Sequence, residues 1–167
     1  GSGPVAEVNG VSYATLADAI NAAKDGETVN MLASTVCTEN TDLTEVKSVT
    51  VDFAQHTFTG DNKNIAIRSK AEGAGVLTLM NGTITTGDGT YCTLGAANGS
   101  AIVVKDMILN NSTAFGGSVK AFPGGTIELR DSQLNSVKGG GVAAAGGTVN
   151  IYNSKIDQKE YYDWNSM

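Results

Sequence analysis

One short pattern of apolar and polar positions recurs along the chain: apolar-x-apolar-x-Asp/Asn-x-x-apolar. It is clearest in residues 124–134, GGTIELRDSQL. Further copies occupy residues 77–84, 102–109 and 149–156, and weaker ones lie at 29–36 and 51–58. The second apolar residue of each copy marks a period of 22 to 26 residues: Met31, Phe53, Leu79, Val104, Leu129 and Ile151. Six units at such a period are typical of a solenoid, a propeller or an array.

Alternation of apolar and polar residues inside each copy predicts a β-strand with one buried face. The apolar residues are mainly Val, Ile and Leu, which suit a pleated surface. No amphipathic run of 10–15 residues separates the copies, which disfavours a βαβ or leucine-rich arrangement. A propeller blade needs roughly 40 residues. The sequence therefore predicts an all-β chain folded as a parallel β-helix of about six coils.

Stacked coils place equivalent residues in inward ladders about 4.8 Å apart. The pattern predicts three ladders: Val29, Val51, Leu77, Ile102, Ile127 and Val149; Met31, Phe53, Leu79, Val104, Leu129 and Ile151; and Val36, Phe58, Ile84, Leu109, Leu134 and Ile156. A polar column falls at the corner after the strand, where Asn and Asp tolerate a left-handed backbone: Asn81, Asp106, Asp131 and Asn153. Short second strands are expected at 65–67, 94–96, 119–121 and 142–143.

The N-terminal region predicts a cap for the first coil. Asn9-Gly10 favours a type I′ hairpin within residues 6–13. A helix is expected over residues 15–24, with Thr15 at its N-cap and Asp25-Gly26 as its stop. Its apolar face would cover the cross-section that the first coil of a solenoid exposes.

One domain is expected at residues 5–157, with its N-terminal cap at 5–26. Residues 1–4 are interpreted as an expression scar and linker. Residues 158–167 are interpreted as a C-terminal tail or end cover, because Tyr161, Tyr162 and Trp164 gather there.

The segments SYATLADAINAAKDGETV (12–29) and SVTVDFAQHTFTG (48–60) resemble the opening of right-handed parallel β-helix proteins of the pectate-lyase-like superfamily. The resemblance covers residues 5–157 and is closest in character to large secreted or wall-attached bacterial surface proteins. It implies a right-handed coil, a capping helix and a broad outer face that meets sugar chains. It also implies a secreted or cell-surface location, with signal and anchor segments outside this sequence. Because the superfamily includes lyases, hydrolases, esterases, epimerases, adhesins and tailspikes, the resemblance specifies the fold more closely than the function.

Composition disfavours several classes of partner and several common types of site. A net charge of −6 argues against nucleic acid, and no apolar run reaches the 18 residues that a membrane span needs. Cys37 and Cys92 lie two coils apart, beyond disulfide reach. His56 is the only histidine, and calcium-loop and zinc spacings are absent from the sequence. We predict neither a metal nor a cofactor.

Candidate chemistry lies on the outward positions of the broad sheet. The predicted outward columns are Leu32, Ala54, Met80, Lys105, Arg130 and Tyr152, and Asn30, Asp52, Thr78, Val103, Glu128 and Asn150. Four of these residues would form one exposed patch that contacts a glycan, although a solvated ion-pair face is the plainer interpretation: Lys105, Glu128, Arg130 and Tyr152.

Catalysis is disfavoured on the same face, because its two carboxylates, Asp52 and Glu128, would stand about 14 Å apart at strand spacing. Inverting hydrolysis needs roughly 6.5–9.5 Å. We therefore predict a non-catalytic module for adhesion or carbohydrate binding. The alternative is a polysaccharide-acting enzyme, a lyase or a glycoside hydrolase, or its cap-containing fragment.

Overall fold

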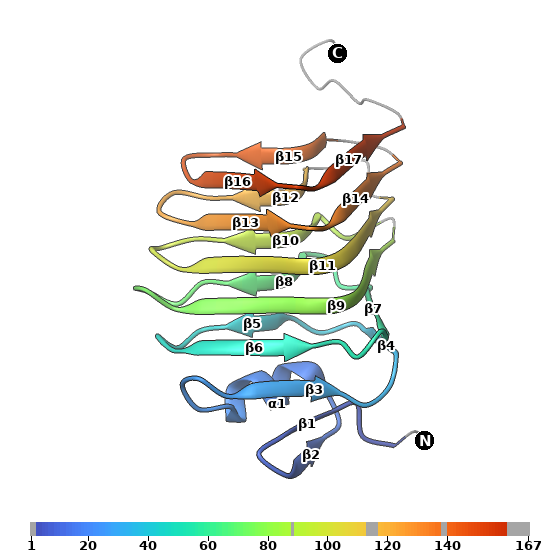
Figure 1. The fold of residues 1–167 in the computed structure, drawn as a ribbon, viewed down its shortest axis with the longest axis vertical. Helices are drawn as coiled ribbons and strands as arrows, with labels where there is room; N and C mark the ends of the chain where they lie inside the picture. Colours follow the sequence, from blue (N-terminus) through green and yellow to red (C-terminus); the bar gives the residue numbers. More distant parts are fainter. Residues whose placement is uncertain (1–2, 88, 113–116, 138–139, 160–167) are drawn as a thin grey trace.

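The computed structural model describes residues 3–87, 89–112, 117–137 and 140–159. These residues form a right-handed parallel β-helix of about five turns, with its single helix at the N-terminal end (Figure 1). Six strand levels stack on the front, whereas five strands form the back sheet, which is why the expected six coils amount to about five full turns. The predicted fold class is confirmed.

Three flat faces surround the core. The front face consists of β3 (Thr28–Met31), β6 (Ser48–Asp52), the first halves of β9 (Val76–Thr86) and β11 (Ala101–Asn111), β13 (Thr126–Arg130) and β16 (Thr148–Tyr152). The side face consists of β4 (Thr35–Cys37), β7 (Thr57–Gly60), the second halves of β9 and β11, β14 (Gln133–Ser136) and β17 (Lys155–Gln158). The back sheet consists of β5 (Thr41–Leu43), β8 (Ile65–Ser69), β10 (Cys92–Ala96), β12 (Gly117–Ala121) and β15 (Gly140–Ala144). The back strands include all four predicted second strands.

The ladders of the later coils agree with the prediction. Leu79, Val104, Leu129 and Ile151 are successive pairing neighbours, as are Leu77, Ile102, Ile127 and Val149. On the side face the same holds for Phe58, Ile84, Leu109, Leu134 and Ile156. Most of these side chains are fully buried, which places the core between the three faces.

Val29 pairs with Val51 as predicted, but the register between β6 and β9 was predicted wrongly. Val51 pairs with Leu79 and Val49 with Leu77, so Phe53 is not the neighbour of Leu79. The cause is the corner after β6, where four residues, 53–56, occupy the place that two, Asn81 and Gly82, fill in the next coil. Ala54 and Gln55 both have positive φ there, 49° and 68°.

Two further assignments change with this register. Thr35 pairs with Phe58, and Val36 is 67% exposed rather than part of a ladder. Neither Leu32 nor Ala54 belongs to a front column. The outward columns are instead Asn30, Asp52, Met80, Lys105, Arg130 and Tyr152, and Thr28, Thr50, Thr78, Val103, Glu128 and Asn150.

The predicted polar corner column is confirmed. Asn81, Asp106, Asp131 and Asn153 have φ between 46° and 64°, the left-handed backbone that Asn and Asp accept most readily among side-chain-bearing residues. In β9 and β11 this single residue turns the strand from the front face onto the side face without ending it.

The N-terminal cap is also confirmed. β1 (Ala6–Val8) and β2 (Val11–Tyr13) form the expected hairpin, with φ of 50° at Asn9 and 75° at Gly10. Helix α1 (Leu16–Ala22) buries Leu16, Ala19 and Ile20, and the backbone N of Asp18 donates to Thr15 Oγ1 over 3.1 Å. It ends two residues earlier than predicted because Ala23 is extended.

Two features of the cap were not predicted. The buried Lys47 side chain donates from Nζ to the carbonyls of Asn21 and Ala23 over 3.1 and 2.6 Å, which satisfies the end of α1. Strand β1 pairs antiparallel with β3, so the hairpin closes the first edge of the front face.

Cys37 and Cys92 are buried and unpaired, as expected. Of the interpreted tail, Gln158 belongs to β17, and residues 160–167 lie outside the described residues. Within the part of the chain that the structure describes, no helix is long and apolar enough to cross a membrane.

Candidate functional site

The four predicted site residues lie together on the front face. Lys105, Arg130 and Tyr152 are direct pairing neighbours on β11, β13 and β16. Glu128 stands two positions before Arg130 and therefore points to the same side. All four point outward because their strand neighbours Val104, Leu129 and Ile127 point into the core. These four residues are called the front patch.

Arg130 is the centre of the front patch. Its Nε donates to Glu128 Oε2 over 2.8 Å, and its Cζ lies 4.3 Å from the centroid of the Tyr152 ring. The hydrogen bond from Arg130 to Glu128 is the largest cause that raises the pKa of Arg130 above its ordinary value. Arg130 thus stays charged and covers part of the Tyr152 ring.

Lys105 differs from Arg130 in its partners. It is exposed between Met80 and Arg130, and no ion pair of Lys105 is found within the described residues. Its ammonium group is therefore the cation of the front patch whose charge is not already matched. Lys105 could therefore contact a ligand carboxylate or hydroxyl without first giving up an ion pair, whereas Arg130 is already paired with Glu128.

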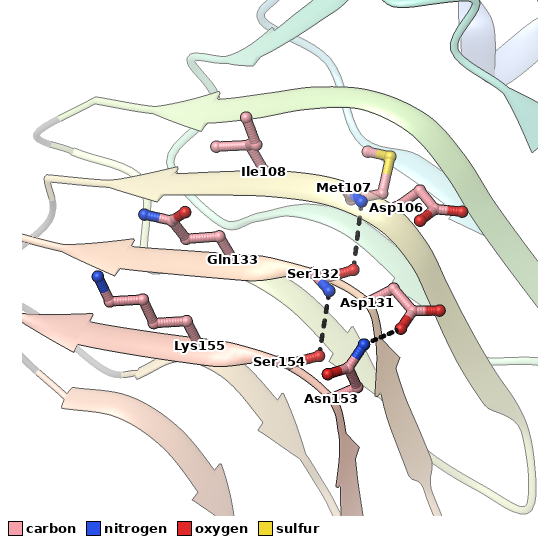
Figure 2. Close-up of a pocket in the computed structure, with 9 residues that line it drawn as sticks. All are labelled: Asp106, Met107, Ile108, Asp131, Ser132, Gln133, Asn153, Ser154 and Lys155. Atoms are coloured by element: carbon pink, nitrogen blue, oxygen red, sulfur yellow. Dashed lines mark hydrogen bonds between the residues drawn. The ribbon is translucent and has the colours of Figure 1, made fainter.

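A groove of about 670 Å³ runs beside the front patch along the corner between the front and side faces. Three consecutive coils contribute the same three positions to it (Figure 2): Asp106, Met107 and Ile108; Asp131, Ser132 and Gln133; Asn153, Ser154 and Lys155. Each triplet directly follows a front-patch residue, Lys105, Arg130 or Tyr152. We call this feature the corner groove.

Hydrogen bonds between coils hold the floor of the corner groove. The backbone N of Met107 donates to Ser132 Oγ over 3.2 Å, and the backbone N of Ser132 donates to Ser154 Oγ over 3.1 Å. Beside the serines, in the polar corner column, Asn153 Nδ2 donates to Asp131 Oδ1 of the preceding coil, as Figure 2 shows. Each serine also bonds back to its own strand, to the carbonyl of Arg130 or Tyr152. The groove and the front patch are therefore tied to one another and pre-organised.

Charges of both signs border the corner groove. Asp106 and Asp131 lie on its front side, with Lys105 and Arg130 beside them, and Lys155 projects from the side face. Carboxylate and amide oxygens accept hydrogen bonds, and ammonium and amide groups donate them. Such a surface suits a ligand rich in hydroxyl groups better than a strongly charged one.

The arrangement offers little for catalysis. Glu128 is held in an ion pair with Arg130 and is not a free base. Asp52 now falls in the Lys105 column but still lies three coils from Glu128. Among the described residues, no three His, Cys, Asp or Glu side chains converge as they would around a metal ion.

Sequence reasoning missed the second wall of the groove: Ile108, Gln133 and Lys155. Their signal was present, because they stand two positions after the Asp/Asn column in consecutive coils. It also missed a cluster near the back sheet, where Lys120 Nζ donates to Tyr91 Oη over 2.6 Å and lies 5.2 Å from the Phe122 ring centroid.

Comparison of the chain with protein-family models, curated proteins and solved structures finds no match. The β-helix fold therefore rests on the structure itself, and the resemblance to the pectate-lyase-like superfamily rests on sequence segments 12–29 and 48–60 alone.

Proposed function

We propose that this chain is a non-catalytic β-helix module that binds an extended carbohydrate along the solenoid axis, in the corner groove and against the front patch. The observation that supports the proposal is repetition: three consecutive coils present the same groove positions, each beside one front-patch residue. Coils stack about 4.8 Å apart, roughly the length of one sugar unit in a chain. A polymer of repeated units is the ligand that suits repeated contacts.

The side chains of the groove match the chemistry of sugar hydroxyls. Asp106 and Asp131 accept hydrogen bonds, Asn153 and Gln133 both donate and accept, and Lys155 donates. The exposed edge of Tyr152 adds apolar contact to a sugar ring. Each contact is exposed and weak, so useful affinity requires several coils at once.

The charge balance favours a neutral or weakly acidic glycan. Three cations and three carboxylates border the site: Lys105, Arg130, Lys155, Glu128, Asp106 and Asp131. A heavily sulfated chain would meet repulsion from the carboxylates. Binding of a weakly acidic chain would fall moderately with added salt, because Lys105 is exposed to screening.

The place of action in this proposal is the cell surface or the extracellular medium. Its support is the resemblance of segments 12–29 and 48–60 to surface β-helix proteins. A glycan-binding role fits that setting, since extended polysaccharides are found there.

A glycan-array screen, followed by titration of the best ligand, tests the proposal. Lys155→Ala and Gln133→Ala should each weaken binding several-fold, because they remove one wall of the groove. Lys24→Ala, an exposed lysine at the N-terminal end, is the matched control and should bind as the unchanged protein does. Binding that ignores both groove changes would refute the site.

A reducing-sugar assay on the same preparation separates binding from turnover. Release of new chain ends would favour the alternative function, a polysaccharide-acting enzyme. Binding without release supports the module.

A further inference from the structure

The N-terminal cap treats the three faces of the first coil differently. On the front face, β1 pairs with β3, and at the back sheet helix α1 packs against β5. On the side face, β4 lies below β7 (Figure 1) and pairs with β7 alone among the described residues. The edge of β4 that faces away from β7 therefore has no neighbouring strand within the part of the chain that the structure describes.

The backbone of Val36 points toward this open edge. Strand β4 runs parallel to β7, and the backbone N of Asp61 donates to the carbonyl of Cys37 over 2.8 Å. Consecutive residues of a strand direct their backbone N–H and C=O groups to opposite edges. Because Cys37 faces β7, Val36 presents its N–H and C=O groups on the other side. Such groups are a template for a further strand.

A groove of about 250 Å³ lies beside the open edge, between the cap and the first coil. Its lining includes Val5, Leu16 and Phe58, which are each no more than 8% exposed, and Val36, which is 67% exposed. Successive side chains of a strand point to opposite faces. A strand added along β4 would therefore direct one apolar side chain into the groove and place the next beside Val36.

We propose that an extended, basic peptide segment of a partner protein adds to β4 as a further strand of the side face. The backbone groups of Val36 hold the segment, and one of its apolar side chains fills the groove. The charge of the groove supports a basic segment. Glu39 lines the groove and is exposed, and no ion pair of Glu39 is found among the described residues. The chain as a whole carries a net charge of −6.

This inference is independent of glycan binding, because the corner groove belongs to later coils. A second copy of the chain is a weaker occupant of the β4 edge than a basic peptide. Two copies with a net charge of −6 repel one another. The three residues of β4 also offer few backbone hydrogen bonds to hold two folded molecules together.

Synthetic peptides of about ten residues that alternate valine with lysine test the proposal by calorimetric titration. We expect binding, together with several-fold slower hydrogen exchange at the Val36 amide when the peptide is present. The matched control is the same peptide with every backbone amide N-methylated, which keeps its charges and side chains but has no backbone donor. It should bind about ten-fold more weakly, because carbonyls of the β4 edge then stay unpaired.

Substitutions at the edge separate strand addition from simple charge attraction. Val36→Pro removes the N–H group that the added strand uses, and proline is tolerated on an edge strand whose N–H faces solvent. It should weaken peptide binding about ten-fold. Val36→Thr keeps the N–H group and the β-branched shape and is the control, with unchanged binding. Glu39→Gln should weaken binding several-fold and reduce its dependence on salt.

Three results would overturn the proposal. They are absence of peptide binding, equal affinity for the methylated and unmethylated peptides, and unchanged affinity of a folded Val36→Pro variant. Should Val36→Pro not fold, the two peptides and the exchange rate of the Val36 amide decide the question in the unchanged chain. A sedimentation mass that rises with protein concentration in the absence of peptide, and does not rise in Val36→Pro, would identify a second copy as the occupant instead.

Discussion

The guanidinium of Arg130 lies over the ring of Tyr152, one coil further along the solenoid, with Cζ 4.3 Å from the ring centroid. This contact and the ion pair with Glu128 occupy Arg130 before any ligand arrives. A glycan that stacked on the covered side of Tyr152 would have to displace Arg130. The side chains of the front patch are therefore held by contacts with one another beside the corner groove, and Tyr152 does not offer an open aromatic ring.

Removal of front-patch side chains should reduce glycan binding and leave the fold intact. We expect Arg130→Ala combined with Tyr152→Ala to lower the affinity for the bound glycan with no change in thermal stability, since both side chains lie on the exposed face. Titration at two salt concentrations, together with a melting curve, measures both effects. Loss of binding only alongside loss of the melting transition would mean that the front patch is structural.

Substitution in the buried ladder should lower stability far more than substitution on the outward side of the same strand. Leu129→Ala should lower the free energy of unfolding by about 2–5 kcal/mol, because removal of the buried leucine side chain leaves a cavity between its ladder neighbours Val104 and Ile151. Glu128→Ala, one residue away but outward, should have a small effect. Urea denaturation of the two variants measures the difference. Equal losses would contradict the register of β13.

Gly82 should be irreplaceable for a reason specific to its coil. A Cβ built there would collide with Phe53 Cβ and with the carbonyl of His56, because the long corner at residues 53–56 fills the space beside it. We expect Gly82→Ala to cost about 1–3 kcal/mol of unfolding free energy.

Gly87→Ala is the control for this substitution, since a Cβ at Gly87 meets nothing within 4 Å. Similar denaturation midpoints for the two glycine variants would show that the corner adapts without strain.

The Cys92 thiol should be inert while the protein is folded. Burial raises its pKa from the ordinary value of 9.0 to about 12, and the opposing charges of Lys120 and Arg68 lower it by less. The folded state therefore keeps the proton when the unfolded state has lost it. This contribution to stability is complete below pH 9 and disappears as the pH rises from 9 toward 12.

Alkylation followed by intact mass measures the reactivity of Cys92. At pH 8 we expect modification of Cys92 only after denaturant is added. A Cys92→Ser variant tests the linkage, because its stability should fall less between pH 9 and 11 than that of the unchanged chain. Rapid labelling of Cys92 in the native protein would mean that the site is open.

The later coils were predictable because their corners have equal lengths. From Leu79 to Ile156 every coil turns with two residues after the front strand, so a fixed sequence template also gives the spatial register. The corner after β6 breaks that rule with two extra residues, and no local propensity of Phe53 or Gln55 announces the change. Gly82 was the available signal, since it alone lacks a side chain at its position in the column.

The geometry of the candidate site was predictable only in part. Period-two alternation places Lys105, Glu128, Arg130 and Tyr152 on one face, and the structure agrees. The corner groove depends on the angle between the front and side faces. Sequence periodicity predicts which face a residue lies on but not that angle. The contact of Arg130 with Tyr152 depends on side-chain rotamers, and these are chosen by neighbours in three dimensions.

Strand β1 runs against β3, whereas every later strand of the front face runs with its neighbour. The hairpin therefore blocks growth of the solenoid at this end, because its strands do not continue the parallel pairing that a further coil would need. A molecule with one blocked end couples at most once. Were the apolar side chains Ile151 and Ile156 at the opposite end to pair with a second copy, association would stop at a pair of molecules and would not continue into a fibre.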